Sequence, residues 1–348
     1  MAKKKKKGFS CLVKIIKFIV FAIISASALV YYIALYPNIK TNNHKKEYLY
    51  IKTGSSYEDV INELTKNNFI NNKFSFIIMS KLKKYDELVK PGRYEIVNGM
   101  NNNHLVNILR AGLQKPINLT FNNIRLKEEL AGKVGRYIEA DSTSLIKEIN
   151  KINFNKYGIN KENALLLFIP NTYEMYWNTN AFEFVNYMIK EYEKFWDDER
   201  MNISKKINLS PAQVGIIASI VAKETNRRKE MPTIAGVYIN RLKKGMLLQA
   251  DPTVVFATKE FDLRRVLHKH LEIDSPYNTY KYKGLPPGPI CIPEKYVIDA
   301  VLNYENHKYI FFCADEKFSG YHNFAENETQ HNANAIKYRK ALNKAKIK

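Results

Sequence analysis

One carboxyl side chain in this sequence follows a strongly apolar stretch at helical spacing. In the segment IASIVAKETN, Glu224 comes three, four and seven residues after apolar positions, namely Val221, Ile220 and Ile217. On an α-helix these spacings place the side chains on one face. An apolar environment disfavours the charged form of a carboxyl group and so raises its pKa. A raised carboxyl pKa is what a general acid needs near neutral pH.

A second interpretation of Glu224 is structural. The residue can end its helix at the solvent and pair with a nearby cation, namely Lys223, Arg227 or Arg228. In that case the carboxyl group stays ionised and carries no chemistry, and periodicity alone leaves both interpretations open.

Polar side chains are dense in two segments beyond Glu224. The first contains Asn240, Gln249 and Asp251. The second, SPYNTYKYKGLPPGPI, contains Tyr277 and Asn278 before a loop rich in proline and glycine. Amides, hydroxyls and aromatic faces are the groups that hold sugars. The five residues are therefore candidates for substrate binding, with turn formation or core packing as the alternative for each.

Other chemistries fit the sequence poorly. It contains no nucleophile elbow, P-loop, zinc-helix motif or dinucleotide fingerprint. Three histidines, His307, His322 and His331, are spaced too irregularly for a metal site and are expected at the surface or in loops. Cys291 and Cys313 are expected to be free thiols, with a disulfide between them as the alternative. We expect no metal and no cofactor.

The N-terminal region predicts one membrane span. The net charge is +21, and residues 1–17 form a lysine-rich tail without acids. Residues 18–36 are uncharged and apolar, close to the roughly 20 residues that cross a bilayer. The positive-inside rule keeps the tail in the cytoplasm and exports the rest, so the chain is expected in the cytoplasmic (inner) membrane. A cleaved signal peptide is the alternative.

The remainder is predicted to be α+β. Residues 37–47 are polar and are predicted to be a linker. Residues 48–115 contain a strand, two helices and a strand, an order that resembles a LysM domain, which is a glycan-binding fold. Residues 116–205 are predicted to be a mostly helical connecting region, and residues 206–348 a mixed α+β domain that contains Glu224.

The region around Glu224 resembles a known enzyme family. The segments IIASIVAKETNRRKEMPTIAGVYINRLKKGMLLQADPTVVFA and SPYNTYKYKGLPPGPICIP are similar to segments of the endolytic murein transglycosylases, the YceG-like family. FIPNTYEMYW resembles the segment upstream of the catalytic domain in that family. The resemblance implies that residues 206–348 are the catalytic transglycosylase domain. It also implies that Glu224, in the Lys-Glu-Thr motif, is the catalytic acid.

The resemblance further implies a reaction and its partners. The MurNAc–GlcNAc β-1,4 bond would be cut inside peptidoglycan strands without water, leaving 1,6-anhydro-MurNAc ends. Glu224 would protonate the glycosidic oxygen and then take the proton of the C6 hydroxyl as that oxygen attacks C1. Expected partners are glycan strands, the cytoplasmic membrane and peptidoglycan synthases, and the expected role is to end strand elongation.

Two departures from the family pattern keep other functions open. Ala222 stands where many members carry a second glutamate, and Ala250 stands in a QTDPT segment that here is QADPT. The first alternative is a membrane-anchored peptidoglycan-binding scaffold without activity. The second is a basic membrane protein that recruits polyanions, which the absence of a nucleic-acid-binding fingerprint disfavours. No nucleic acid is expected as a partner.

Overall fold

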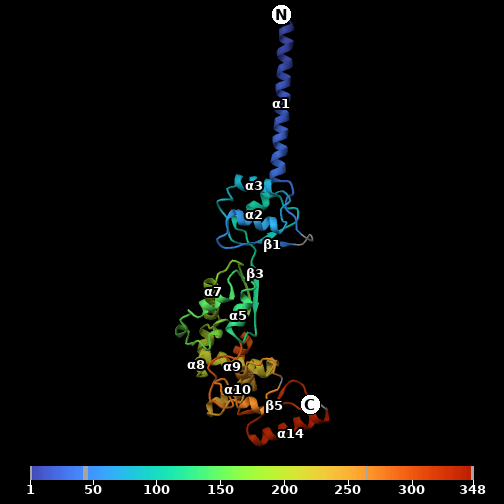
Figure 1. The fold of residues 1–348 in the computed structure, drawn as a ribbon. Helices are drawn as coiled ribbons and strands as arrows, with labels where there is room; N and C mark the ends of the chain where they lie inside the picture. The colour runs from blue at the N-terminus through green and yellow to red at the C-terminus, as the bar shows by residue number, and fades with distance from the viewer. Residues whose placement is uncertain (1, 42–45, 264, 346–348) are drawn as a thin grey trace. The chain divides into compact units, whose positions relative to one another are not determined.

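The computed structural model describes residues 2–41, 46–263 and 265–345, and the side chains of the first helix from Cys11 onward. The chain divides into two compact units (Figure 1). Unit 1 is Met1–Asn118 with Glu174–Thr179, and unit 2 is Leu119–Tyr173 with Asn180–Lys348. Both combine helices with two-stranded sheets, so the predicted α+β class is confirmed.

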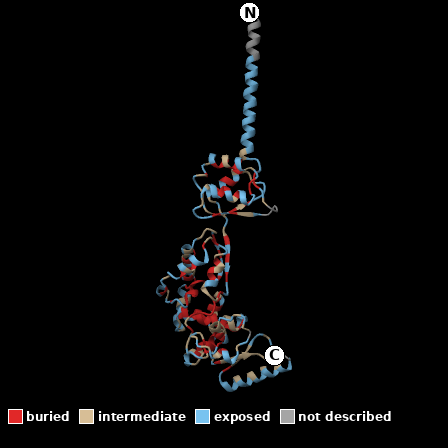
Figure 2. Cartoon of the chain, viewed as in Figure 1, coloured by how far each residue is buried: buried red, intermediate tan, exposed pale blue. Residues whose placement is uncertain are grey.

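The first helix, α1 (Ala2–Ala34), is long and apolar enough to cross a membrane. Its segment Cys11–Ala34 has a mean hydropathy of 2.2. The side chains from Cys11 to Tyr32 are exposed, as the pale-blue helix in Figure 2 shows. An exposed apolar surface of this length is unusual for a helix in water and suits a helix surrounded by lipid.

Unit 1 also contains a small α+β module. Strands β1 (Glu47–Ile51) and β2 (Gly92–Ile96) pair antiparallel, with Glu47 opposite Ile96 and Ile51 opposite Gly92. Helices α2 (Tyr57–Lys66) and α3 (Lys73–Leu82) lie between them in the chain, and α4 (Asn102–Ala111) follows. The predicted strand-helix-helix-strand order is present. Its identity as a LysM fold stays a prediction.

The segment predicted to be a polar linker begins instead as part of this module. Pro37 forms a β-bridge with Asn101, and Ile39 forms one with Ile70. Ile39 is only 2% exposed within the module's core. The buried Asn38 side chain donates to the Asn72 carbonyl over 2.9 Å. The burial of Ile39 and the hydrogen bond of the buried Asn38 amide therefore make the start of this polar segment part of the module. Residues 42–45 lie outside the described residues.

Unit 2 begins with a sheet and a layer of helices. The sheet joins β3 (Ile117–Phe121), which starts in unit 1, to β4 (Asn171–Met175). The helices of this part are α5 (Lys127–Val134), α6 (Ser142–Ile149), α7 (Ala181–Phe195) and α8 (Asp198–Lys206), with short 3-10 turns at Phe154–Tyr157 and Ala164–Leu167.

The rest of unit 2 surrounds one buried helix, α9 (Pro211–Glu224). Its remaining helices are α10 (Met231–Lys243), α11 (Asp251–Thr258), α12 (His268–Leu271), α13 (Lys295–Leu302) and α14 (Glu328–Lys344), with a 3-10 turn at Arg228–Glu230. Strands β5 (Phe311–Ala314) and β6 (His322–Ala325) form an antiparallel pair. Helices α8, α10, α11 and α13 contact α9, which lies in the buried region coloured red in Figure 2.

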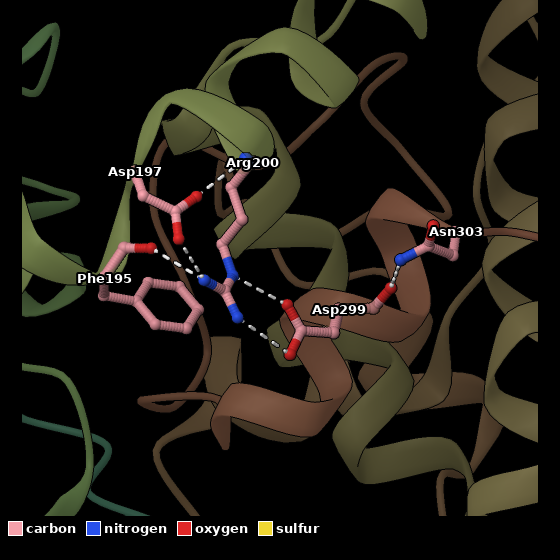
Figure 3. Close-up of polar contacts among 5 residues, drawn as sticks. All are labelled: Phe195, Asp197, Arg200, Asp299 and Asn303. Atoms are coloured by element: carbon pink, nitrogen blue, oxygen red, sulfur yellow. Dashed lines mark hydrogen bonds and ion pairs between the residues drawn. The ribbon is translucent and has the colours of Figure 1, made fainter.

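An arginine ties the connecting helices to this part (Figure 3). The Arg200 guanidinium on α8 donates to both carboxylate oxygens of Asp299 on α13, over 2.9 and 3.4 Å. It also donates to Asp197 over 2.9 Å and to the Phe195 carbonyl over 3.2 Å. A planar cation that bridges two carboxylates holds α8 in a fixed position against α13, and through it against α9.

Candidate active site

Residues at both ends of helix α9 define where the helix begins and ends. The Ser210 side chain accepts from the Gln213 amide, the Gln213 side chain accepts from the Ser210 amide, and Pro211 occupies the first helical position. At the other end Thr225 turns to an extended conformation, with φ −147° and ψ 146°. The helix therefore stops at Glu224, which places this carboxyl group in the last turn.

The body of α9, from Val214 to Val221, is buried and apolar apart from Ser219, and a loop packs against it. Ile217, Ile220 and Val221 are each 0% exposed. The Ser219 hydroxyl accepts from the Ile290 amide over 3.0 Å, which fixes the loop after the GLPPGP segment against the helix. Because most of α9 is buried, its last turn cannot shift toward solvent without breaking this packing.

Glu224 is half-buried at the end of the apolar helix, and the described residues give its side chain one hydrogen-bond partner. The Tyr238 hydroxyl, on α10, donates to a Glu224 carboxylate oxygen over 2.5 Å. The pKa of Glu224 is raised to about 7: burial raises it most, the Tyr238 hydrogen bond lowers it, and the negative charge of Asp251 raises it. A carboxylate at the carbonyl end of a helix is disfavoured as well. Near neutral pH the group is therefore able both to donate and to accept a proton.

The ion pairs considered for Glu224 are not formed by the residues that the structure describes. Lys223 donates to the Asn123 side chain. Arg227 lies over the Tyr321 ring at 5.3 Å, and Arg228 over the Tyr296 ring at 3.9 Å. Each cation thus has another partner, and the geometry favours the interpretation of Glu224 as an acid.

Glu224 lines a cavity of about 490 Å³. The cavity combines carboxyl groups, cations and aromatic or aliphatic side chains, namely Arg125, Lys223, Glu224, Asp251, Pro252, Val255, Phe256, Phe261, Leu263, Arg265, Val266 and Ile290. Its size falls in the range typical of ligand sites. Among the described residues no cluster of His, Cys, Asp and Glu could hold a metal ion, and the described cysteines are free thiols.

Asp251 is the predicted binding residue that shares the cavity with Glu224. It is the first residue of α11 and accepts from the Tyr280 hydroxyl. Gln249 lies just before α11 with a positive φ of 52°. Its side-chain oxygen accepts from Arg241, which also donates to the Leu247 carbonyl over 2.9 Å. Gln249 thus helps to position the start of α11, and it is not among the cavity-lining residues.

The other predicted binding residues hold the chain's own loops. The Asn240 amide nitrogen donates to the carbonyls of His307 and Tyr309, over 2.7 and 3.0 Å. The Asn278 amide nitrogen donates to two carbonyls over 2.8 Å each, and the residue is 0% exposed. Both N–H donors of each amide are therefore used, and neither can bind a sugar through them. Tyr277 packs on the cavity residue Phe256, with ring centroids 4.7 Å apart.

Tyr238 is the site residue that sequence reasoning missed. It looks like an ordinary core position of α10, and only the packing of α10 on α9 brings its hydroxyl to Glu224. Its ring meets Phe312 edge to face at 6.0 Å, and Phe312 meets His322 in the same way at 5.2 Å.

The histidine behind Tyr238 corrects an expectation. His322 lies in strand β6 and is half-buried, and its ring nitrogen Nδ1 and its backbone amide contact the buried carboxylate of Glu230 over 2.8 and 2.7 Å. His307 lies in a loop, as expected, and is half-buried, with Nε2 at 2.9 Å from the Thr233 carbonyl. These contacts fix the strand pair that supports the Tyr238 ring.

The raised pKa predicts how stability depends on pH. Below the unfolded-state pKa of 4.5, folded and unfolded chains both carry the Glu224 proton. As pH rises from 4.5 to about 7, only the folded chain keeps it, so this part of the stability is progressively lost. Glu224→Gln removes the dependence. The variant should match the wild type near pH 4.5 and exceed it above pH 7 by up to about 3 kcal/mol.

Thermal unfolding of the full-length protein in detergent, at pH 4.5 and pH 8, measures this difference. Glu260→Gln, which changes an exposed carboxyl group of the same unit, is the matched control and should show no such trend. A Glu224→Gln effect of equal size at both pH values would contradict the buried acid.

The sequence matches the model of the YceG-like family over residues 49–337. It is 29% identical over 306 residues to the endolytic murein transglycosylase of Bacillus subtilis, covering 83% of each chain. It is 26% identical over 332 residues to the endolytic murein transglycosylase of Streptococcus pneumoniae strain D39, covering 86% of this chain but 60% of that one.

A solved structure is similar as well. The crystal structure of a putative YceG-like protein from Listeria monocytogenes aligns with a TM-score of 0.56 and 28% sequence identity. The alignment covers 83% of this chain and 98% of that one. The family model spans most of the chain, including both the module of unit 1 and the Glu224 cavity. The chain belongs to the YceG-like family.

Proposed function

We propose that this protein is a membrane-anchored endolytic lytic transglycosylase that cuts the MurNAc–GlcNAc β-1,4 bond inside peptidoglycan strands. Relatives over most of the chain carry the name endolytic murein transglycosylase. The observation that carries the proposal is Glu224, a carboxyl group with a pKa raised to about 7 in a cavity large enough for sugar rings. The products would be strands that end in 1,6-anhydro-MurNAc.

The reaction needs one group that gives and then takes a proton. Protonated Glu224 donates to the glycosidic oxygen, and the bond between C1 and that oxygen breaks. The C6 hydroxyl of the same MurNAc attacks C1, and the Glu224 carboxylate accepts its proton, so the acid is restored. Tyr238 donates to the carboxylate form and so stabilises the intermediate charge. The attacking group is part of the substrate, which gives it a high effective concentration.

Asp251 is the group on which a hydrolytic alternative depends. Glycosidases that use water need two carboxyl groups beside the bond. Asp251 lines the cavity, and its carboxylate accepts from the Tyr280 hydroxyl. We assign it to substrate positioning and to raising the pKa of Glu224, because the intramolecular attack leaves it no water to activate.

The anchor places this chemistry outside the cytoplasm. The lysine-rich start of the chain stays inside by the positive-inside rule, and α1 crosses the cytoplasmic membrane once. The module follows the span directly, because Ile33 and Ala34 already pack against its core. Glycan strands leaving the membrane are then the accessible substrate, which suits an enzyme that ends strand elongation beside the synthases.

Replacement of the acid tests the proposal. Glu224→Gln keeps the shape and the acceptor for Tyr238 but cannot donate the proton. We expect strand cleavage to fall by about 10²–10⁴-fold, the usual contribution of a general acid. The measurement is mass spectrometry of peptidoglycan incubated with full-length protein in detergent, since a cut at residue 40 would remove the core residue Ile39.

The products separate the alternatives. Internal fragments with 1,6-anhydro-MurNAc ends, formed by the wild type alone, support the proposal. Reducing ends would indicate hydrolysis with Asp251 as the second carboxyl group. Binding to cell walls without products from the folded wild type would replace the enzyme by a glycan-binding scaffold.

Tyr238 predicts a shift in the pH profile. Because Glu224 must be protonated to act, the wild-type rate should fall as pH rises above about 7. Tyr238→Phe removes the hydrogen bond that lowers this pKa, so the falling limb of kcat against pH should move to higher pH. Tyr304→Phe, at a hydroxyl that contacts only Lys243 among the described residues, is the control. If the falling limb of kcat against pH does not move in Tyr238→Phe, Glu224 does not control the rate.

A further inference from the structure

The cavity has a cationic side that the proposed reaction does not use. Arg125 and Lys223 both line it beside Glu224. The Arg125 guanidinium lies 4.5 Å from the centroid of the Phe261 ring, and Lys223 donates to the Asn123 side chain. Neither cation forms an ion pair with a carboxylate in the part of the chain that the structure describes.

The positive charge of Arg125 disfavours the charged form of Lys223. Burial lowers the pKa of Lys223, and the nearby charge of Arg125 lowers it further, while the Cys291 thiol and Glu129 act in the opposite direction. Glu129 uses its carboxylate to accept from the Arg125 backbone amide over 2.8 Å. Two half-buried positive charges without a paired carboxylate gain free energy when an anion enters between them.

We infer that Arg125 and Lys223 form a subsite for carboxylates on the peptide stem of the MurNAc whose bond is cut. The inference rests on the proposed function. Inside a strand the sugar rings are neutral, and the stem peptides carry the carboxylates. The stem is attached at C3 of MurNAc, two ring positions from the C1 that reacts. Lys223 precedes Glu224 in the chain and lines the same cavity, so a stem on that sugar lies within reach.

The subsite predicts selectivity between charged and neutral stems. We expect kcat/KM to be about tenfold higher for strands with free stem carboxylates than for strands whose carboxylates are amidated. Tenfold is the scale of one hydrogen bond to a charged group. The ratio should decrease at high salt, because part of the subsite faces solvent.

The experiment compares two preparations of the same strands, both with acetylated amines, one of them amidated at its carboxylates. Full-length protein in detergent is used throughout. Lys223→Gln and Arg125→Gln should each bring the ratio toward one, while Lys223→Arg, which keeps the charge, should retain it. Lys244→Gln, at an exposed lysine beyond α10, is the matched control and should also retain it.

Each outcome of this experiment supports or overturns the carboxylate subsite. Equal cleavage of both strands by the wild type overturns the subsite and leaves the proposed function intact, as does a full ratio in Lys223→Gln. Absence of cleavage of either strand overturns the proposed function and the subsite together. If amidation leaves kcat/KM unchanged but removal of a lipid-linked diphosphate from the strand end lowers it, the cations bind phosphate and not the stem carboxylates.

A different observation, in unit 1, concerns the membrane. The end of α1 is held directly by the module: the Asn102 side chain donates to the Ile33 carbonyl over 2.8 Å, and the Asn72 side chain to the Tyr32 hydroxyl over 3.0 Å. Tyrosines at the end of a span lie at the level of the lipid headgroups. Asn72 is the N-cap of α3, so the start of α3 lies at this level too.

Helix α3 exposes an apolar stripe beside this contact. Phe74 and Leu82 are each 72% exposed, the same fraction as Phe18 within the span, and Ile78 lies between them at helical spacing. Exposed lysines flank the stripe at both ends, namely Lys73, Lys81 and Lys84. Apolar side chains bordered by lysines are typical of a helix that lies in a membrane surface.

We propose that the Phe74–Leu82 stripe of α3 inserts into the headgroup region of the membrane that α1 crosses. The proposal rests on the membrane anchor of the proposed function. It gives the module a second attachment to the bilayer, which restricts its rotation about α1. Interfacial anionic lipids would add to the attachment through the flanking lysines.

A photo-crosslinking amino acid at position 74 or 82 of the full-length protein in native membranes tests this. We expect lipid adducts at both positions and none at Leu113, a 61% exposed position beyond the far end of α4. Position 31, inside α1, is the positive control. Lipid adducts at position 31 but not at position 74 would overturn the insertion of the stripe alone. If position 31 also gives no lipid adduct, the membrane anchor is overturned as well. Protein adducts at 74 would replace lipid by a protein partner.

Discussion

The proposed chemistry of unit 2 depends on the partial burial of one carboxyl group at the carbonyl end of an apolar helix. Helix α9 cannot move Glu224 into solvent, because its body is packed on several sides and its last turn ends there. Burial and the helix end both disfavour the carboxylate. A single hydrogen bond from Tyr238 acts the other way. The balance leaves the pKa at about 7, where a small change of environment decides the protonation state.

Much of the surrounding structure serves to hold this balance. The Tyr238 ring is fixed by Phe312, and Phe312 lies against His322, which is bound to Glu230. On another side Arg241 joins the α10 end to the segment before α11, which begins with Asp251. A hydroxyl that must meet one carboxylate oxygen tolerates little displacement, and rigid neighbours provide the precision.

Sequence reasoning found what local patterns encode. The Ser210 cap, Pro211 and the apolar run predict α9, and the position of Glu224 after that run predicts its raised pKa. The role of Tyr238 was not predictable, since it depends on how two helices pack. Asn240 and Asn278 resemble sugar-binding amides in sequence, yet backbone carbonyls occupy their donors, distant in the chain for Asn240 and five and seven residues away for Asn278. Arg125 lies in residues 116–205, which are predicted to be a connecting region, and it is far in sequence from Glu224.

The absence of a glutamate at position 222 has little bearing on the proposed reaction. Successive residues of an α-helix are rotated by about 100°, so side chains at 222 and 224 point to nearly opposite sides. A carboxyl group at 222 would therefore lie away from the face that carries Glu224 to Tyr238 and could not complete a pair across one glycosidic bond. Ala222 therefore removes no partner of Glu224. Ala222, the sequence feature that favours an inactive scaffold, therefore gives that alternative little support once the helix geometry is considered.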